Sequence, residues 1–175
     1  MVTVGKDAPD FTLKGVFREQ IEDFALKSYR GKWLVLFFYP ADFTFICPTE
    51  VIAFSKMAEE FRAEDTDILG VSVDSLESHR EWVKELGGVD YPLLSDSGKQ
   101  VSRDYGVLDE KEGVSQRGTF IINPSGHLSY LMVSHMNVGR SVEETLRVLK
   151  ALRTNRLCPS DWKPGEKTGD TALKY

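Results

Sequence analysis

The apolar positions of the chain fall into short continuous runs and longer segments with a helical period. Residues 33–39, "WLVLFFY", form an unbroken apolar run that is too short for a helix, and residues 67–73, "DILGVSV", form a second run. Both runs predict buried strands. Between them, residues 48–63 place their apolar side chains at helical spacing, which predicts a helix. A strand, a helix and a strand in this order predict a parallel pair with a right-handed crossover.

Capping residues and glycines mark the next elements. Asp74 or Ser75 is expected to cap a helix that runs through Leu86 and ends at the glycine pair 87–88. Residues 91–98, "YPLLSDSG", predict a short extended piece and a turn.

The last third of the chain predicts a short helix, a hairpin and a final helix. The short helix covers residues 98–105, and residues 119–122 and 127–133 flank a turn with proline and glycine at the positions that a type I turn prefers. The sequence Ser141-x-x-Glu144 is a capping box that opens a helix to about residue 154.

This order of elements is the thioredoxin-like arrangement, an α/β fold with a central mixed sheet and flanking helices. The N-terminal segment "APDFTLKGV…EDFAL" predicts an added hairpin ahead of it. Residues 156–175 contain two prolines and two glycines and show no period, so they predict an arm. We therefore expect a thioredoxin-like domain over residues 1–155 and a C-terminal arm over residues 156–175.

Length and charge narrow the class of protein. The 175 residues fit one domain, since domains usually span about 100–200 residues. With 22 basic and 27 acidic residues the net charge is −5, and no basic run suggests nucleic-acid binding. The longest apolar run is far shorter than the roughly 20 residues of a membrane helix. No signal peptide is recognisable at the N-terminus, so the expected location is the cytoplasm.

The chain has two cysteines, Cys47 and Cys158, and no C-x-x-C motif. Two cysteines are too few for a disulfide scaffold, and no closely spaced Cys/His set predicts a structural zinc site. The three histidines are interpreted as ordinary surface or strand-end residues. In a reducing compartment the cysteines are either inert core thiols or partners in a transient catalytic disulfide.

Cys47 lies where the strand 33–39 gives way to a helix, and Pro48 suits the first helical turn. Unpaired N–H groups and the helix dipole favour a thiolate there, although free cysteines are often buried and inert. Thr44 has the spacing of the first position of a redox C-x-x-C motif. Its hydroxyl could contact a small oxygen-bearing substrate beside the sulfur, or it could cap the helix.

Two arginines and one glutamate complete the candidate site. A guanidinium from Arg117, at the start of the strand that contains residues 119–122, would stabilise a thiolate and donate to a departing oxygen anion. Arg140 could support it, or could pair with the acidic start of the helix that follows. Glu50 belongs near a thiolate only if it orients an arginine. Cys158, in a proline-rich tail, is either an idle exposed thiol or a thiol that travels to meet Cys47.

The stretch "FFYPADFTFICPTE" resembles the active-site motif of the peroxiredoxins, Pro-x-x-x-Thr-x-x-Cys, with Pro40, Thr44 and Cys47 at the matching positions. "RGTFIINPSG" and "NVGR" resemble the family's two arginine segments, and "LCPSDWKPGEK" resembles the segment with the resolving cysteine of the typical two-cysteine subgroup. The resemblance covers residues 4–168 and is closest to the bacterial alkyl hydroperoxide reductase C-type proteins.

This resemblance implies an antioxidant peroxidase that reduces hydrogen peroxide and organic hydroperoxides. Cys47 would be the peroxidatic nucleophile, with Pro40, Thr44 and Arg117 around it and Glu50 and Arg140 in support. Cys158 of another subunit would resolve the sulfenic acid. The resulting disulfide would be reduced by thioredoxin or by a flavoprotein of the alkyl hydroperoxide reductase type, and no metal or organic cofactor is expected.

Further properties of the family also carry over as expectations. The chain would form a homodimer that assembles to a decamer. Peroxiredoxins sensitive to overoxidation carry a Gly-Gly-x-Gly segment and a C-terminal Tyr-Phe, where this chain has "GGVD" at residues 87–90 and ends in "ALKY". Resistance to overoxidation is therefore expected. A one-cysteine peroxidase and a non-enzymatic holdase chaperone remain the alternatives.

Overall fold

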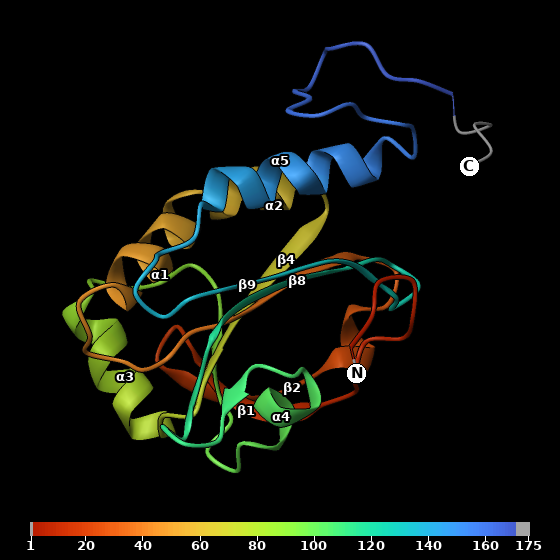
Figure 1. Ribbon diagram of the computed structural model, residues 1–175. Coiled ribbons are helices and arrows are strands. Elements are labelled where there is room, and N and C mark those ends of the chain that lie inside the picture. Colours follow the sequence, from red (N-terminus) through yellow and green to blue (C-terminus); the bar gives the residue numbers. More distant parts are fainter. Residues whose placement is uncertain (1, 171–175) are drawn as a thin grey trace. The chain divides into compact units, whose positions relative to one another are not determined.

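The computed structural model describes residues 2–170 (Figure 1). The chain falls into two compact units, Met1–Arg140 and Ser141–Tyr175. The second unit holds the last helix as well as the predicted arm. The division of the chain at residue 155 stays a prediction. The C-terminal "ALKY" lies outside the described residues. No helix within residues 2–170 is long and apolar enough to cross a membrane.

A seven-stranded sheet forms the centre of the first unit, in the order β2-β1-β5-β4-β3-β8-β9. The strands β3, β4 and β5 are parallel to one another, whereas β8 runs antiparallel to β3 and β9 antiparallel to β8. The predicted parallel pair and hairpin are therefore confirmed. The N-terminal hairpin β1–β2 joins the same sheet, because β1 pairs with β5. The strands are β1 (Thr12–Phe17), β2 (Gln20–Ala25), β3 (Trp33–Phe38), β4 (Thr66–Ser72), β5 (Leu93–Ser95), β8 (Arg117–Ile122) and β9 (Leu128–Ser134).

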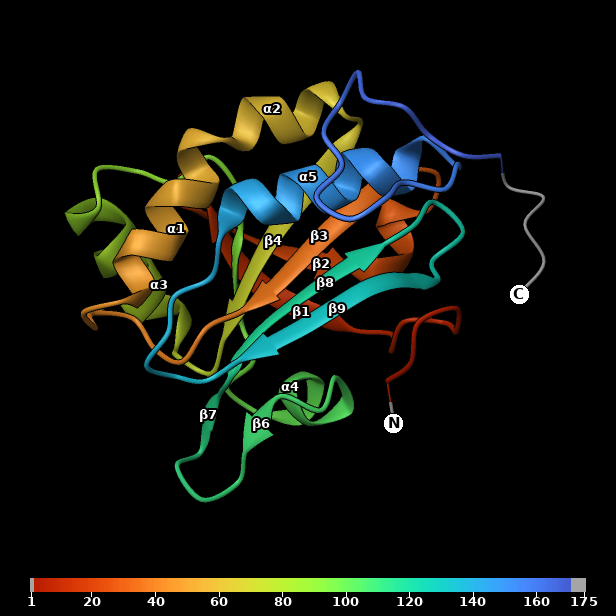
Figure 2. The same ribbon diagram turned by 45° about the horizontal axis from the view of Figure 1, so that its top comes forward.

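Helices of the first unit cover both faces of this sheet. On one face Phe37 of β3 stacks on Phe54 of α1, with ring centroids 4.3 Å apart. On the other face the ring centroids of Phe38 and of Tyr105, the residue after α4, lie 5.3 Å apart. Successive side chains of a strand point to opposite faces, and both faces of the sheet are covered at β3. Its side chains are therefore apolar at every position, and this continuous apolar run is the pattern that predicted the strand. The helices are η1 (Leu26–Tyr29), α1 (Cys47–Lys56), α2 (Ala58–Ala63), α3 (Leu76–Glu85) and α4 (Gln100–Asp104), and Figure 2 shows α4 beside the small β6–β7 hairpin.

Several boundaries differ from the sequence-based expectation. The single helix expected over residues 48–63 is two helices, because the backbone at Met57 (φ −97°, ψ 4°) departs from helical geometry. Ser75, one of the two candidate caps, begins α3, and its hydroxyl accepts a hydrogen bond from the Ser78 N–H. The hairpin of β6 (Leu108–Asp109) and β7 (Val114–Ser115) was not expected, since two-residue strands leave no hydrophobic alternation to detect.

The second unit contains α5 (Val142–Arg153) and the segment after it. The Ser141 hydroxyl accepts a hydrogen bond from the Glu144 N–H, which confirms the predicted cap. The Glu144 carboxylate pairs with Arg147 instead of closing the reciprocal half of the capping box. The segment after α5 is ordered by a bridge between Leu157 and Gly169.

Candidate active site

Cys47 is the first residue of α1, and its side chain is completely buried. The chain reaches it from β3 through Tyr39 and Pro40, which are also buried, and then through a loop over residues 41–46. Pro48 follows at once in the first helical turn, where its missing N–H costs no intrahelical hydrogen bond. The sulfur therefore lies at the positive end of a helix and is closed off from water.

Arg117 brings a guanidinium to this sulfur. Its Nη1 atom lies 3.4 Å from the Cys47 Sγ atom and 2.6 Å from a Glu50 carboxylate oxygen. Its Nε–H donates to the Met136 carbonyl, so hydrogen bonds to Met136 and Glu50 together fix the orientation of the guanidinium. Arg117 begins β8, the antiparallel neighbour of β3, and this pairing places it beside the start of α1.

Glu50 links Arg117 to a second buried arginine, Arg140. The backbone N–H and the Nε–H of Arg140 donate to one Glu50 oxygen at 2.8 and 2.9 Å. The remaining guanidinium N–H groups of Arg140 reach the Phe38 and Gly118 carbonyls at 2.6 and 2.7 Å. Burial lowers the pKa of Arg140, but a guanidinium stays charged at neutral pH. Glu50 therefore forms ion pairs with both arginines, and Arg140 pairs with Glu50.

The charges of this cluster do not balance without the sulfur. Arg117 and Arg140 are cations, and Glu50 is the one carboxylate hydrogen-bonded to both. Buried charges are costly unless they are paired, so the cluster favours one further negative charge. Cys47 lies next to Arg117, and a thiolate there would supply that charge. The arrangement can hold a thiolate and can aim donors at an oxygen beside it.

Thr44 lies in the exposed part of the loop, and its hydroxyl donates to the Ala41 carbonyl at 3.1 Å. No side chain caps α1, so the alternative that Thr44 is the helix cap is wrong. With its proton engaged, the Thr44 oxygen keeps its lone pairs as acceptors. Phe45 is 93% exposed and forms part of the apolar surface of this loop.

Cys158 lies in the second unit, on the segment after α5, and its side chain is half-buried. Its Sγ atom lies 3.4 Å from the Thr154 hydroxyl oxygen and 3.8 Å from the Ala151 carbonyl oxygen. Both cysteines are free thiols. The Cys158 thiol is therefore partly shielded and not fully exposed, and its role as a resolving cysteine stays a prediction.

A second buried polar cluster, in the loop that carries Thr44, was not predicted from the sequence. The Asp42 carboxylate accepts hydrogen bonds from Tyr39, Ser78 and His79 at 2.9, 2.7 and 2.8 Å. The interpretation of His79 as a surface residue was wrong, because its side chain is fully buried. Its position three residues before the buried Trp82 places it on the apolar side of α3, and this spacing was the available signal.

Within residues 2–170, no group of three or more His, Cys, Asp or Glu side chains could hold a metal ion. The fold and the site together define a thioredoxin-fold protein with a buried cysteine thiol held against an arginine. The AhpC/TSA family profile matches residues 4–131. The chain belongs to this family, the peroxiredoxins, and is a thiol-dependent peroxidase with an antioxidant role that uses a hydroperoxide and a thiol reductant.

Individual relatives agree with this assignment. The chain is 51% identical over 176 residues to the putative peroxiredoxin YkuU of Bacillus subtilis, a match that covers 94% of this chain and 97% of that protein. The crystal structure of the reduced 2-Cys peroxiredoxin of Plasmodium vivax superimposes with a TM-score of 0.91 at 37% identity, over 96% of this chain and 93% of the other. Mycobacterium bovis AhpC gives a TM-score of 0.84 at 37% identity, over 93% and 99% of the two chains.

Proposed function

We propose that Cys47 is the peroxidatic cysteine and that Arg117, Arg140 and Glu50 form its charge-balancing support. The observation that carries this assignment is the 3.4 Å contact between the Arg117 guanidinium and the Cys47 sulfur, within a cluster that lacks one negative charge. The contact places a cation and a hydrogen-bond donor beside the sulfur that would react. Pro40, buried next to the loop, shields the thiolate from water.

In the first step the Cys47 thiolate attacks the nearer oxygen of a hydroperoxide ROOH. The new S–O bond forms as the O–O bond breaks, and the departing RO⁻ takes a proton to become ROH. Sulfur is oxidised to a sulfenic acid while the peroxide is reduced. Arg117 and the Cys47 backbone N–H donate to the oxygen on which charge develops, and the Thr44 oxygen accepts the hydrogen bond of the peroxide hydroxyl.

In the second step the Cys158 thiol of another subunit attacks the Cys47 sulfenic acid, and a disulfide and water form. Cys47 is completely buried in the first turn of α1, so this turn must unwind before the two sulfurs can meet. A dithiol protein, thioredoxin or a flavoprotein reductase, then restores both thiols. We further propose a cytoplasmic homodimer that assembles to a decamer, an expectation supported by the resemblance to the two-cysteine subgroup.

The test is a non-reducing denaturing gel. The protein is fully reduced, freed of reductant, treated with about one equivalent of hydrogen peroxide and quenched with a thiol-blocking reagent. The expected band moves from one chain to two, and the shift is lost in both Cys47→Ser and Cys158→Ser. A protein that stays monomeric with both thiols titratable would contradict the assignment of Cys47. A monomer that consumes peroxide without Cys158 would instead indicate a one-cysteine cycle.

A further inference from the structure

The start of α1, which must unwind in the proposed cycle, is weakly held by its own backbone. The helix begins at Ile46 without a side-chain cap. The Ile46 carbonyl accepts the N–H groups of Thr49 and Glu50 at 3.0 and 3.4 Å, and the second distance is long for an N–H···O hydrogen bond. The Thr49 hydroxyl donates to the same carbonyl at 2.6 Å. An uncapped start with a long first hydrogen bond is a weak point of a helix.

The second turn of α1 is held by the segment that joins α3 to β5. The Tyr91 hydroxyl donates to the Val51 carbonyl at 2.8 Å, and the Asp90 N–H donates to the Ser55 hydroxyl oxygen at 2.9 Å. Tyr91 and Val51 are both buried, so water does not replace their hydrogen bond when it breaks locally. Burial raises the pKa of Tyr91, so the phenol stays protonated and can donate.

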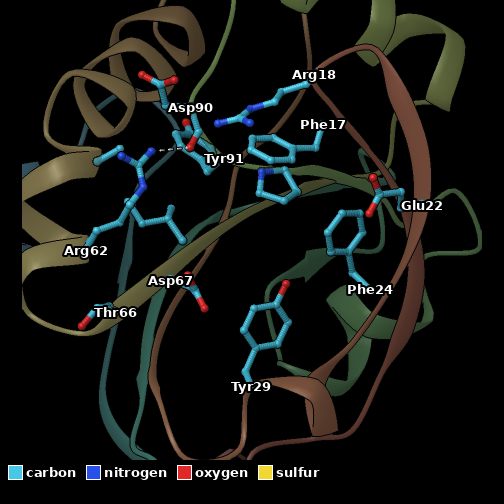
Figure 3. Close-up of a pocket in the computed structure, with 13 residues that line it drawn as sticks. Phe17, Arg18, Glu22, Phe24, Tyr29, Arg62, Thr66, Asp67, Asp90 and Tyr91 are labelled. Carbon is cyan, nitrogen blue, oxygen red and sulfur yellow. Dashed lines mark hydrogen bonds between the residues drawn. The ribbon is translucent and has the colours of Figure 1, made fainter.

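This joining segment is itself held by the helices and the sheet. The Asp90 carbonyl accepts a hydrogen bond from Arg62 of α2 at 3.0 Å, which Figure 3 shows as a dashed line beside Tyr91. The Tyr91 ring packs edge-on against Phe37 of β3 and Phe54 of α1, with ring centroids 5.7 and 6.4 Å apart. The ring is therefore fixed in the core, and its hydroxyl is a fixed anchor for α1.

The position of this anchor limits the reach of Cys47. Val51 lies four residues after Cys47. Four residues span about 6 Å along a helix and about 13 Å in an extended chain, so unwinding up to Val51 moves Cys47 outward by roughly 7 Å. Phe54 then keeps its stacking on Phe37, with ring centroids 4.3 Å apart. Unwinding beyond Val51 would expose the fully buried Phe54 side chain.

We propose that Tyr91 is a positioning residue for the second step of the peroxidase cycle, because its hydroxyl stops the unwinding of α1 at Val51 and so sets how far Cys47 can move. The inference rests on the proposed function, in which Cys47 must move to meet Cys158. A short tether keeps the released sulfur at a high effective concentration near its target, whereas a longer unwound segment spreads it over a larger volume. Tyr91 therefore acts after the peroxide has reacted.

Backbone amide exchange reports where the unwinding stops. In helical geometry the N–H groups of residues 55–57 donate to the carbonyls of residues 51–53. Unwinding of residues 47–50 exposes earlier amides but leaves these protected. Without the Tyr91 hydroxyl, an opening beyond Val51 breaks one hydrogen bond fewer, and one buried hydrogen bond corresponds to about a fivefold change in the opening equilibrium.

The test is hydrogen-exchange mass spectrometry on the full chain, reduced and after oxidation with about one equivalent of hydrogen peroxide. In the unmodified protein, oxidation is expected to speed exchange over residues 47–54 and to leave residues 55–57 protected. In oxidised Tyr91→Phe, residues 55–57 should exchange about fivefold faster. Disulfide formation after a peroxide pulse should be slower in this variant, by up to about fivefold.

The matched control is Tyr105→Phe. Tyr105 is also buried, and its hydroxyl donates to the Pro9 carbonyl at 2.8 Å, on the other face of the sheet. The control loses an equivalent hydrogen bond, so an effect that comes only from lower overall stability appears in both variants. Neither the exchange of residues 55–57 nor the rate of disulfide formation should change in Tyr105→Phe.

The outcomes separate this inference from the proposed function. Unchanged exchange at residues 55–57 in oxidised Tyr91→Phe, an unchanged rate of disulfide formation, or equal effects in Tyr105→Phe would overturn the role of Tyr91 and leave the peroxidase cycle intact. Residues 47–54 that stay protected after oxidation would contradict the unwinding step of the proposed function, and the role of Tyr91 would fall with it.

Discussion

Replacing Arg117 by glutamine removes the guanidinium next to the Cys47 sulfur while keeping a polar side chain. The 3.4 Å contact to Cys47 disappears, and Glu50 keeps its three hydrogen bonds from Arg140. The remaining Glu50–Arg140 pair is then neutral. A thiolate at Cys47 would have no cation to compensate it, and the developing charge on the peroxide oxygen would lose its donor.

The distance between the Arg117 guanidinium and the Cys47 sulfur gives an upper limit for the interaction energy that the substitution removes. Two unit charges 3.4 Å apart interact by about 5 kcal/mol at an effective dielectric constant of about 20. Only the part of this interaction that grows toward the transition state accelerates the reaction. Loss of one such donor in other enzymes typically costs about 100- to 1,000-fold in rate. We therefore expect the second-order rate constant with hydrogen peroxide to fall by about 100-fold or more.

The assay is stopped-flow measurement of peroxide consumption by the pre-reduced protein in a single turnover, which does not involve the reductant. Arg117→Lys is the matched variant, because it keeps the charge but loses the fork that contacts both Cys47 and Glu50, so its rate should be intermediate. A rate for Arg117→Gln within threefold of the unmodified protein, in a variant whose unfolding midpoint shows it to be folded, would refute the reasoning about the charge cluster.

Three further predictions follow from other parts of the chain. His79→Ala should lower the free energy of unfolding in urea by about 3–5 kcal/mol, because it removes one of the three side-chain hydrogen bonds to the buried Asp42 carboxylate and leaves a cavity at a fully buried position, whereas the exposed His135→Ala should change it by less than about 0.5 kcal/mol. The hydrogen bonds from Arg147 lower the pKa of Glu144. The interaction between these two side chains therefore stabilises the folded state at pH values above the ordinary carboxyl pKa, and this stabilisation is lost as the pH falls through the lowered pKa. Carbon-13 NMR should show Glu144 titrating low and returning to ordinary values in Arg147→Gln. Mass spectrometry at modest peroxide excess should show no gain of two oxygens on Cys47, and such a gain would contradict the expected resistance to overoxidation.

Much of the fold follows from patterns that span whole elements. The run at residues 33–39 predicted β3 because a central strand is buried on both faces, and the structure pairs it with β4 and β8. The break at Met57 was not predictable, since the apolar period continues through it. The pairing of β1 with β5 also left no trace in either segment, because a partner far along the chain imposes no local pattern.

The candidate site was predictable to the extent that its residues adjoin recognisable elements. Cys47 adjoins a strand end and a helix start, and Arg117 begins a strand, so both positions were visible in the sequence. Glu50 contacts both arginines because three segments of the chain meet in the folded structure. The sequence predicted only that Glu50 would belong near the thiol if it oriented an arginine. His79 was missed because a histidine in an otherwise amphipathic helix resembles a surface residue unless its spacing from Trp82 is considered.

The charge cluster also connects the two steps of the proposed cycle. In this cycle a thiolate at Cys47 would balance the excess positive charge of Arg117, Arg140 and Glu50, and its ionic contact with Arg117 would hold the first turn of α1 in place. A sulfenic acid is neutral at the sulfur, and its formation removes that contact while Glu50 remains bound to both arginines. The hold on Cys47 therefore weakens at the moment when the sulfur must leave its buried position to meet Cys158. In the proposed cycle, Arg117 thus favours the thiolate before the peroxide reacts and favours release of the first turn only afterwards.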